Sequence, residues 1–322
     1  MKILITGGAG FLGQKLCQQL LQLPQNQAPM EIVLSDLQFE HSRFANHKSV
    51  QQISGDFSTR EMANALATRN PDVIFHLAAI VSGQAEQEFE TGMRVNFNGT
   101  LNLLEALRTH SNKPRFIFSS SCAVYGGELP AVTTDHTIAM ASSSYGAQKN
   151  ACEILLNDYA RKGYVQGLSL RLPTVVVRPG KPNAAASSFA SGIIREPLCG
   201  IDAICPVSVD TELWITSPST VVNNLIHAMN FNYAALKGNT IVPLPGITVS
   251  VKQMIEALKM LTSEKVSQRI HFNQDRFIQS IVYSWPAHFK LERCYELGFE
   301  ADRNIREIIA EFIAVELSGS WV

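Results

Sequence analysis

A strand-like segment runs directly into a glycine-rich turn near the start of the chain, and this junction constrains the fold more than any other feature. Residues 2–6 are mostly apolar, the glycines within 7–13 follow the spacing G-x-x-G-x-x-G, and residues 11–21 have helical periodicity. Glycines so spaced allow a tight turn and let backbone N–H groups approach a pyrophosphate, which the N-terminus of the next helix also attracts. The flanking strand and helix favour this interpretation over a turn without a ligand. The expected dinucleotide contacts are Gly7, Gly10, Phe11, Leu12 and Gly13.

Strand-like and helical segments alternate through the rest of the first half. Strands are expected at 31–36, 53–56, 72–79, 115–121 and 167–173, and helices at 58–69, 85–109 and 142–162. This alternation is typical of βαβ units, so we expect an α/β Rossmann fold with a doubly wound parallel sheet. Prolines interrupt the pattern after residue 173. We therefore expect residues 1–173 to form the dinucleotide-binding domain and 174–322 a smaller, partly interleaved substrate-binding region, some of whose elements return to the sheet.

The composition favours a small-molecule ligand. The formal net charge of −1 offers no electrostatic footprint for nucleic acid or an anionic membrane. No apolar run approaches the ~18 residues of a membrane span, and the N-terminus lacks the features of a secretory signal. The six cysteines include no CxxC pair, so we expect free thiols in a cytoplasmic protein and no metal site.

Two aspartates follow the predicted second and third strands. Asp36 is placed to accept hydrogen bonds from both ribose hydroxyls and to repel a 2′-phosphate, and the next arginine along the chain is only Arg43. This pattern favours NAD over NADP. Asp56 is close enough to the same edge to reach the adenine amino group, although an acid at a helix N-terminus is an equally good interpretation.

A tyrosine and a lysine one helical turn apart form the candidate catalytic pair. Tyr145 and Lys149 lie on one face of the helix expected over 142–162. A phenol with a pKa near ~10 is a poor base at neutral pH, whereas a nearby ammonium stabilises the phenolate and can also hold a nicotinamide ribose.

These segments together resemble the extended short-chain dehydrogenases/reductases, the NAD-dependent epimerase/dehydratase-like class. The resemblance rests on TGGAGFLG, HLAA, RVNFNGT, SSSCAVYG and SSYGAQK, and covers about the first 180 residues. It implies that Tyr145 transfers the proton, that Lys149 is its partner, and that Ser121 polarises the reacting oxygen. The cofactor contacts that it implies are Leu77, Ala79, Asn96, Ser119, Tyr145, Lys149 and Pro173. For Asn96 alone, a satisfied amide inside a helix remains the alternative.

The segment from Arg171 to Leu198 indicates which member of the class this chain resembles. Dehydratases of the class carry Asp-Glu where Cys122 and Ala123 stand, so elimination of water is disfavoured. The segment itself resembles the D-erythronate dehydrogenase group, which implies oxidation of the 2-hydroxyl of a small sugar acid by NAD. A carboxylate substrate needs a fixed cation. The expected substrate contacts are Ser82, Ser121, Arg178, Ser187 and Arg195, with a structural ion pair or a surface position as alternatives for the two arginines.

Two other functions remain open from the sequence. A nucleotide-sugar epimerase needs little beyond the dinucleotide and Tyr145, and a non-catalytic dinucleotide-sensing regulator can use the same fold. Retention of both Tyr145 and Lys149 disfavours the regulator. Members of the class commonly pair through the helix that carries these two residues, so a homodimer is expected.

Overall fold

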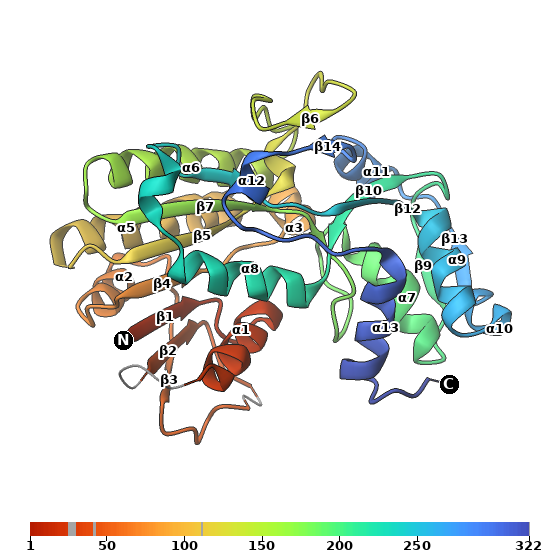
Figure 1. Ribbon diagram of the computed structural model, residues 1–322, viewed down its shortest axis with the longest axis horizontal. Helices are drawn as coiled ribbons and strands as arrows, with labels where there is room; N and C mark the ends of the chain where they lie inside the picture. Colours follow the sequence, from red (N-terminus) through yellow and green to blue (C-terminus); the bar gives the residue numbers. More distant parts are fainter. Residues whose placement is uncertain (25–29, 41–42, 111, 322) are drawn as a thin grey trace.

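A parallel sheet of seven strands forms the larger lobe in the computed structural model, which describes residues 1–24, 30–40, 43–110 and 112–321 (Figure 1). In spatial order the strands are β3 (Val50–Ser54), β2 (Glu31–Asp36), β1 (Lys2–Thr6), β4 (Val73–His76), β5 (Arg115–Ser121), β7 (Gln166–Leu172) and β11 (Ile241–Pro243). The order reverses between β1 and β4, which opens a crevice at the carboxyl ends of the strands, where ligands of such sheets bind. The predicted doubly wound parallel sheet is confirmed.

Helices cover both faces of this sheet because its strands are apolar on both sides. In β1, Ile3 and Ile5 face one core and Leu4 faces the other, as the two-residue period of a strand requires. The first core includes α1 (Phe11–Gln22) and α8 (Pro218–Asn230), and the second includes α2 (Arg60–Ala67), α5 (Gly99–His110) and α6 (Ser144–Arg161). Each fully buried side chain of this size contributes about 1.5–3 kcal/mol to folding.

The segment expected as one helix over 85–109 is broken into several pieces. They are α3 (Ser82–Gln87), α4 (Phe89–Gly92), the π-helical turn η1 (Met93–Asn98) and α5. Glu88 leaves the helical region at φ −118° and ψ 67°, which bends the chain between α3 and α4. The wide turn η1 carries Asn96, whose side chain bonds the backbone of Ile80 instead of facing solvent. The bends keep the start of this segment close to the carboxyl end of β4.

The second lobe is built around three short strands and a separate apolar core. These strands are β8 (Thr174–Val175), β10 (Glu212–Thr216) and β12 (Ile247–Ser250). Its helices are α7 (Ser188–Leu198), α9 (Val251–Leu261), α10 (Glu264–Ser267), α11 (Arg276–Val282) and α13 (Ile305–Glu316). The remaining short elements are η2 (Cys122–Val124), β6 (Thr133–Thr134), β9 (Ala203–Cys205), η3 (Tyr233–Leu236), β13 (Ile270–Phe272), β14 (Phe289–Lys290) and α12 (Arg293–Glu296).

The chain passes between the two lobes more than once. After β8 and α7 in the second lobe, α8 returns to pack against the large sheet, and β11 pairs in parallel with β7 (Figure 1). This interleaving holds the two lobes together on either side of the crevice.

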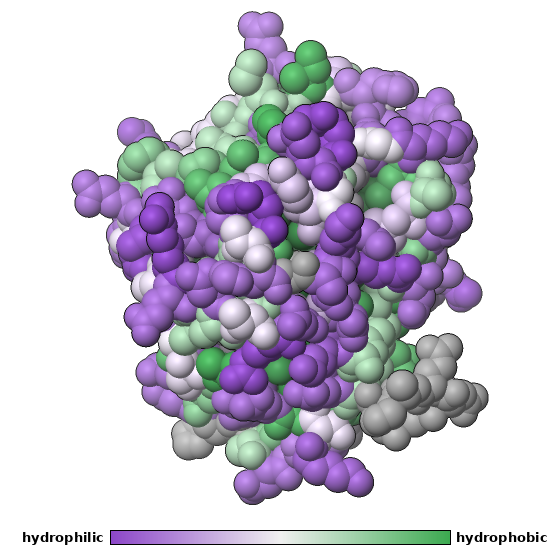
Figure 2. Space-filling view, turned by 90° about the vertical axis from the view of Figure 1, so that its left-hand side faces the viewer, coloured by the Kyte–Doolittle hydropathy of each residue, from purple (hydrophilic) through white to green (hydrophobic). Residues whose placement is uncertain are grey.

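The surface carries no large apolar area on the face seen in Figure 2. Hydrophilic residues predominate there, and apolar ones are scattered in small groups, as on an ordinary protein surface. Among the helices of the described ranges, none is both long and apolar enough to span a bilayer.

Candidate active site

A cavity of about 720 Å³ lies at the carboxyl ends of the large sheet and reaches into the second lobe. The sequence-predicted residues that line it are Gly7, Gly10, Phe11, Leu12, Gly13, Asp36, Asp56, Leu77, Ala79, Ser82, Ser119, Ser121, Tyr145, Lys149, Pro173, Arg178, Ser187 and Arg195. Both lobes therefore contribute to one site: the large sheet supplies the glycine-rich turn, and the second lobe supplies the two arginines.

The glycine-rich turn forms a cradle that side chains would fill. Gly7 has a φ of +71°, and a Cβ there would lie 2.8 Å from the backbone nitrogen of Ala78. A Cβ on Gly13 would overlap the carbonyl oxygen of Gly7. No side chain caps the first turn of α1 at Gly10, so its first N–H groups lack intrahelical partners and are free for an anion. The geometry suits a pyrophosphate.

Asp36 is fixed at the end of β2 beside this cradle. Its Oδ2 accepts the N–H of Ala9 at 2.9 Å, and its Oδ1 accepts the N–H of Leu37 at 2.8 Å. Each oxygen keeps a second lone pair for a hydroxyl donor. In the described parts of the chain no cation forms an ion pair with Asp36, so its charge disfavours a phosphate at this place.

Asp56 is already engaged within the protein. Its Oδ1 accepts the N–H of Ser58 at 2.9 Å and the hydroxyl of Ser58 at 2.6 Å, and its Oδ2 pairs with Arg94 at 2.5 Å. Burial raises the pKa of Asp56, but these hydrogen bonds and the charge of Arg94 outweigh it and hold the pKa below its ordinary value. The side chain thus fits the helix-terminus interpretation, while a contact to adenine stays a prediction. Arg94 also lines the cavity and was not identified from the sequence.

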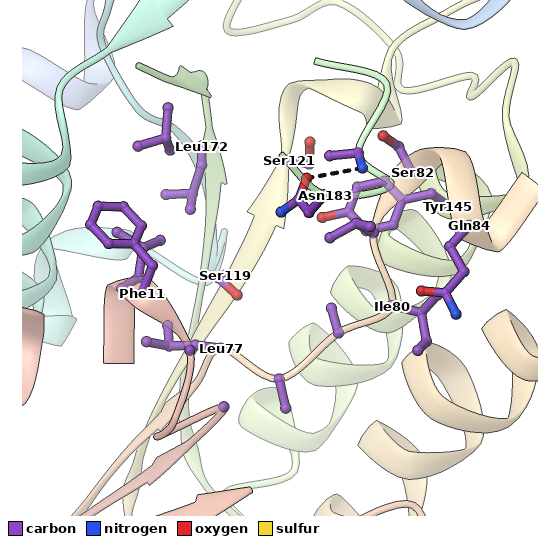
Figure 3. A pocket seen from close by; sticks show the side chains of 18 of the residues that line it. Phe11, Leu77, Ile80, Ser82, Gln84, Ser119, Ser121, Tyr145, Leu172 and Asn183 are labelled. Carbon is purple, nitrogen blue, oxygen red and sulfur yellow. Dashed lines mark hydrogen bonds between the residues drawn. The ribbon is translucent and has the colours of Figure 1, made fainter. Parts of the chain in front are cut away.

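The start of α6 brings the proposed catalytic groups together. Ser143 caps this helix by accepting the N–H of Gly146 at 3.2 Å, which fixes Tyr145 in the first turn. Ser121 ends β5, and its Oγ accepts the N–H of Ala123 at 3.1 Å. In Figure 3, Tyr145 lies beside Ser121, with Phe11, Leu77 and Leu172 across the cavity from it.

Lys149 lies one turn further along α6 and is almost completely buried. Its Nζ donates to the carbonyl of Ser119 at 2.8 Å and lies 4.5 Å from the ring centroid of Phe118. Burial lowers the pKa of Lys149 to about 8, against the charges of Cys152 and Glu153, which raise it. The ammonium is therefore held at the end of β5, with two of its three donors left for a ligand.

The charge that acts on Tyr145 comes from the second lobe. Burial raises the pKa of Tyr145 to about 12, and the nearby Cys122 also raises it. A hydrogen bond with Ser121 and the guanidinium of Arg178 lower it. The sequence interpretation assigned this stabilising role to Lys149, whose Nζ lies 5.7 Å from the centre of the Tyr145 ring. Arg178 is thus a cation that favours the phenolate of Tyr145.

Arg178 and Arg195 lie together in the part of the cavity wall that the second lobe supplies. Arg195 donates from Nη1 to the carbonyl of Arg178 at 2.7 Å and from Nη2 to Glu196 at 2.5 Å. The backbone N–H of Arg178 donates to Ser191 at 3.0 Å, but its guanidinium has no hydrogen-bond or ion-pair partner among the described residues. Burial and the charge of Arg195 lower the pKa of Arg178. An uncompensated guanidinium in a cavity wall is suited to a carboxylate.

Three serines contribute to this part of the cavity in different ways. The Oγ of Ser82 accepts the N–H of Ala186 at 3.0 Å, which leaves its hydroxyl proton for a ligand. Ser188 accepts the N–H of Asn183 at 3.1 Å, whereas Ser187 precedes α7 without capping it. Ser82 and Ser187 therefore retain hydrogen-bonding capacity toward the cavity.

Asn96 is the predicted cofactor contact that does not line the cavity. Its Oδ1 accepts the N–H of Ile80 at 2.7 Å, and its Nδ2 donates to the carbonyl of Ile80 and to Gln148. All of its polar atoms are satisfied within the protein. Asn96 holds the backbone of Ile80, which lines the cavity. Its contacts therefore match the alternative interpretation, a satisfied amide inside a helix.

Trp285 reaches the cavity from the loop after α11 and was not identified from the sequence. Its Nε1 is buried and has no hydrogen-bond partner within the described ranges. A buried indole N–H usually finds an acceptor. A lone tryptophan in an irregular loop carries no periodic signal, so only the fold could bring it to the site.

Comparisons with known proteins agree with this geometry. The model of the NAD dependent epimerase/dehydratase family matches residues 3–202. A Haemophilus influenzae protein named D-erythronate dehydrogenase is 45% identical over 98% of this chain and 100% of that protein. A Cupriavidus necator protein of the same name is 44% identical over 97% of this chain and 98% of that protein. A structure described as the nucleoside-diphosphate-sugar epimerase from Agrobacterium tumefaciens has a TM-score of 0.92 and 39% identity, and the match covers 99% of this chain and 95% of that one. The chain belongs to the NAD dependent epimerase/dehydratase family.

Proposed function

We propose that this protein oxidises the 2-hydroxyl of a small sugar acid, D-erythronate or a close analogue, to the 2-oxo acid with NAD. The observation that carries the proposal is the free guanidinium of Arg178 in the same cavity as Tyr145 and Ser121. A carboxylate bound there places its neighbouring hydroxyl within the same small region as the phenol. The two D-erythronate dehydrogenases that resemble the chain over nearly its full length support this choice.

The residues around the glycine-rich turn fit NAD. The cradle of Gly7, Gly10 and Gly13 and the free N–H groups of α1 would hold the pyrophosphate, and Asp36 would accept the ribose hydroxyls. Lys149 would hold the nicotinamide ribose with its remaining donors. When bound, NAD accepts the hydride from C2 of the substrate.

The protein residues orient the hydroxyl and remove its proton. Arg178 holds the carboxylate, and Ser121 hydrogen-bonds the C2 hydroxyl beside Tyr145. Because a phenolate is the proton acceptor, Ser121 and Arg178 favour proton transfer by opposing the rise that burial causes in the pKa of Tyr145. The hydroxyl proton passes to the Oη of Tyr145 as the C2–H bond breaks, and the products are the 2-oxo acid and NADH.

The direct test is formation of NADH from NAD and D-erythronate, followed by its absorbance at 340 nm, the usual wavelength for reduced nicotinamide. Tyr145→Phe should abolish turnover while leaving NAD affinity near that of the wild type, because the ring still packs in the same place. A screen of four- to six-carbon aldonates without NADH formation would refute the proposal.

A nucleotide-sugar epimerase is the second candidate, which the Agrobacterium tumefaciens structure favours by its description. Calorimetric titration with UDP-glucose separates the two functions. Binding of UDP-glucose together with tightly retained NAD would support the epimerase, whereas the sugar-acid dehydrogenase should bind no UDP-glucose.

We also propose that the protein forms a homodimer through α6. The outward face of this helix exposes Ile154 to 63% of its accessible surface, an unusual position for a large apolar residue. Light scattering of the purified protein should give twice the chain mass, and Ile154→Lys should reduce it to that of a monomer. A monomeric wild-type protein would refute the dimer.

A further inference from the structure

The carboxylate of Glu196 contacts one of the two arginines at the substrate end, by which we mean the part of the cavity lined by Arg178 and Arg195. Glu196 follows Arg195 on α7 and accepts its Nη2–H at 2.5 Å. The side chains of both residues are largely buried, with 8% of Arg195 and 13% of Glu196 exposed. Arg178 and Arg195 line the cavity, whereas Glu196 does not. Glu196 therefore reaches a ligand only through Arg195.

The local structure makes room for this carboxylate although burying it is unfavourable. Gly192 lies one turn earlier on α7, and a Cβ there would come within 3.2 Å of Glu196 Oε2. That oxygen is buried and has no hydrogen-bond partner among the described residues. An apolar side chain in this place would avoid the unfavourable desolvation. Packing alone therefore does not explain why a negatively charged residue is found there.

The charges of the residues around the substrate end explain why a carboxylate is useful at position 196. Among the described residues that line this end, Arg178 is the partly buried cation without an acceptor, since Glu196 neutralises Arg195. Lys181 is exposed at the mouth, where solvent screens its charge. Lys149 is held at the carbonyl of Ser119. One partly buried guanidinium, that of Arg178, is thus available to bind one anionic group.

We propose that Glu196 is a positioning residue that makes the site selective for singly charged hydroxy acids and against dicarboxylates and phosphorylated acids. This inference rests on the proposed function, because it assumes that Arg178 receives the substrate carboxylate. A second anionic group would lie in the same low-dielectric cavity without a free cation, and an unpaired buried charge is strongly unfavourable. Without Glu196, Arg195 would become a second free cation.

A matched pair of ligands tests the charge preference. meso-Tartrate has the carbon chain and hydroxyl configuration of D-erythronate, with a second carboxylate in place of the terminal hydroxymethyl group. Calorimetric titrations of both acids against the NADH-bound enzyme give dissociation constants without turnover. The wild type should bind meso-tartrate more weakly than D-erythronate. In Glu196→Gln the dissociation constant of meso-tartrate divided by that of D-erythronate should fall by about tenfold or more. The charge of Arg195 is then free to pair with the second carboxylate, which only meso-tartrate has.

A double variant separates charge from shape. In Arg195→Gln/Glu196→Gln both charges are lost, Glu196 nearly keeps its size and Arg195 becomes shorter, so the ratio should return to the wild-type value. If Glu196→Gln weakens both acids by the same factor, or if the double variant keeps the altered ratio, Glu196 has only a structural role and the proposal fails. Should Glu196→Gln not fold, Arg195→Gln alone gives the converse test: it leaves Glu196 unbalanced and should raise the ratio.

A second ligand pair keeps this test independent of the proposed function. Glycolate and tartronate are the smallest 2-hydroxy acids with one and two carboxylates, and they are titrated in the same way. If D-erythronate neither binds nor reduces NAD, the proposed function fails. The role of Glu196 is still decided by whether the tartronate-to-glycolate ratio falls in Glu196→Gln or stays the same.

Discussion

Replacing Arg178 should affect both substrate binding and proton transfer, and the two effects can be measured separately. Arg178→Gln removes the free guanidinium that faces the cavity. Loss of one partner of a buried, hydrogen-bonded charge pair costs about 2–5 kcal/mol, which corresponds to about 30- to 5000-fold in kcat/KM. Because the carboxylate is held alike in the ground and transition states, most of this loss should appear in KM. Initial-rate measurements with D-erythronate and NAD give both constants.

The pH dependence supplies the second measurement. Oxidation needs the phenolate of Tyr145, so kcat should rise with pH until that group is ionised. Arg178 lowers the pKa of Tyr145 by its charge, and Arg178→Gln should therefore move the rise in kcat to higher pH. Arg178→Lys, which keeps the charge but not the two-pronged geometry, should raise KM and shift the profile less. An unchanged KM in Arg178→Gln would show that another residue holds the carboxylate and would refute the reasoning.

Three further substitutions test other parts of the site. Gly13→Ala forces a Cβ onto a backbone carbonyl of the glycine-rich turn and should weaken NAD binding, measured by calorimetry, by about tenfold or more; Gly10→Ala, with a looser contact of 3.1 Å, should weaken it less. Equal effects would contradict the cradle geometry. Glu153→Gln leaves the buried guanidinium of Arg171 without its carboxylate and should lower the free energy of unfolding in urea by about 3–5 kcal/mol. Replacing both residues of this pair by methionine should cost less than the single change, and a larger loss would argue against the charge explanation. Trp285→Phe replaces the indole by a smaller ring without the unpartnered N–H and should raise KM about two- to tenfold, whereas an unchanged KM would show that this N–H does not contact the substrate.

The residues that the sequence proposes for the cofactor line the cavity, with the exception of Asn96, and most of them belong to short local patterns. The turn at Gly7–Gly13 and the acid at Asp36 lie at the carboxyl ends of adjacent parallel strands, and apolar runs with glycine-rich or polar ends mark such strands directly. Helical spacing predicts only that Tyr145 and Lys149 share one face, since they lie four residues apart, whereas their catalytic roles are implied by the resemblance. In each case a few neighbouring residues fix the geometry.

The failures have a physical cause as well. The π-helical turn contains Asn96, whose side chain hydrogen-bonds the backbone of Ile80 in a different segment, and the chain breaks from helical geometry at Glu88. No periodicity within one segment reports such a bond. The same holds for Arg94, which pairs with Asp56 across the cavity wall, and for Trp285. Only the three-dimensional fold shows that Arg94 and Trp285 line the cavity.

The division of the site between the lobes also limits how its chemistry can change. Ser121, Tyr145 and Lys149 are held by β5 and α6, which pack in the core of the large sheet. The groups that face the substrate come from the segment around Arg178 and from α7, which belong to the other core. We therefore expect a change of charge in α7 to alter which acid binds without disturbing the sheet that holds Tyr145 and Lys149. The exception is Arg178: its charge lowers the pKa of Tyr145, and in the proposed mechanism it also holds the carboxylate, so substrate binding and proton transfer would be coupled through that one residue.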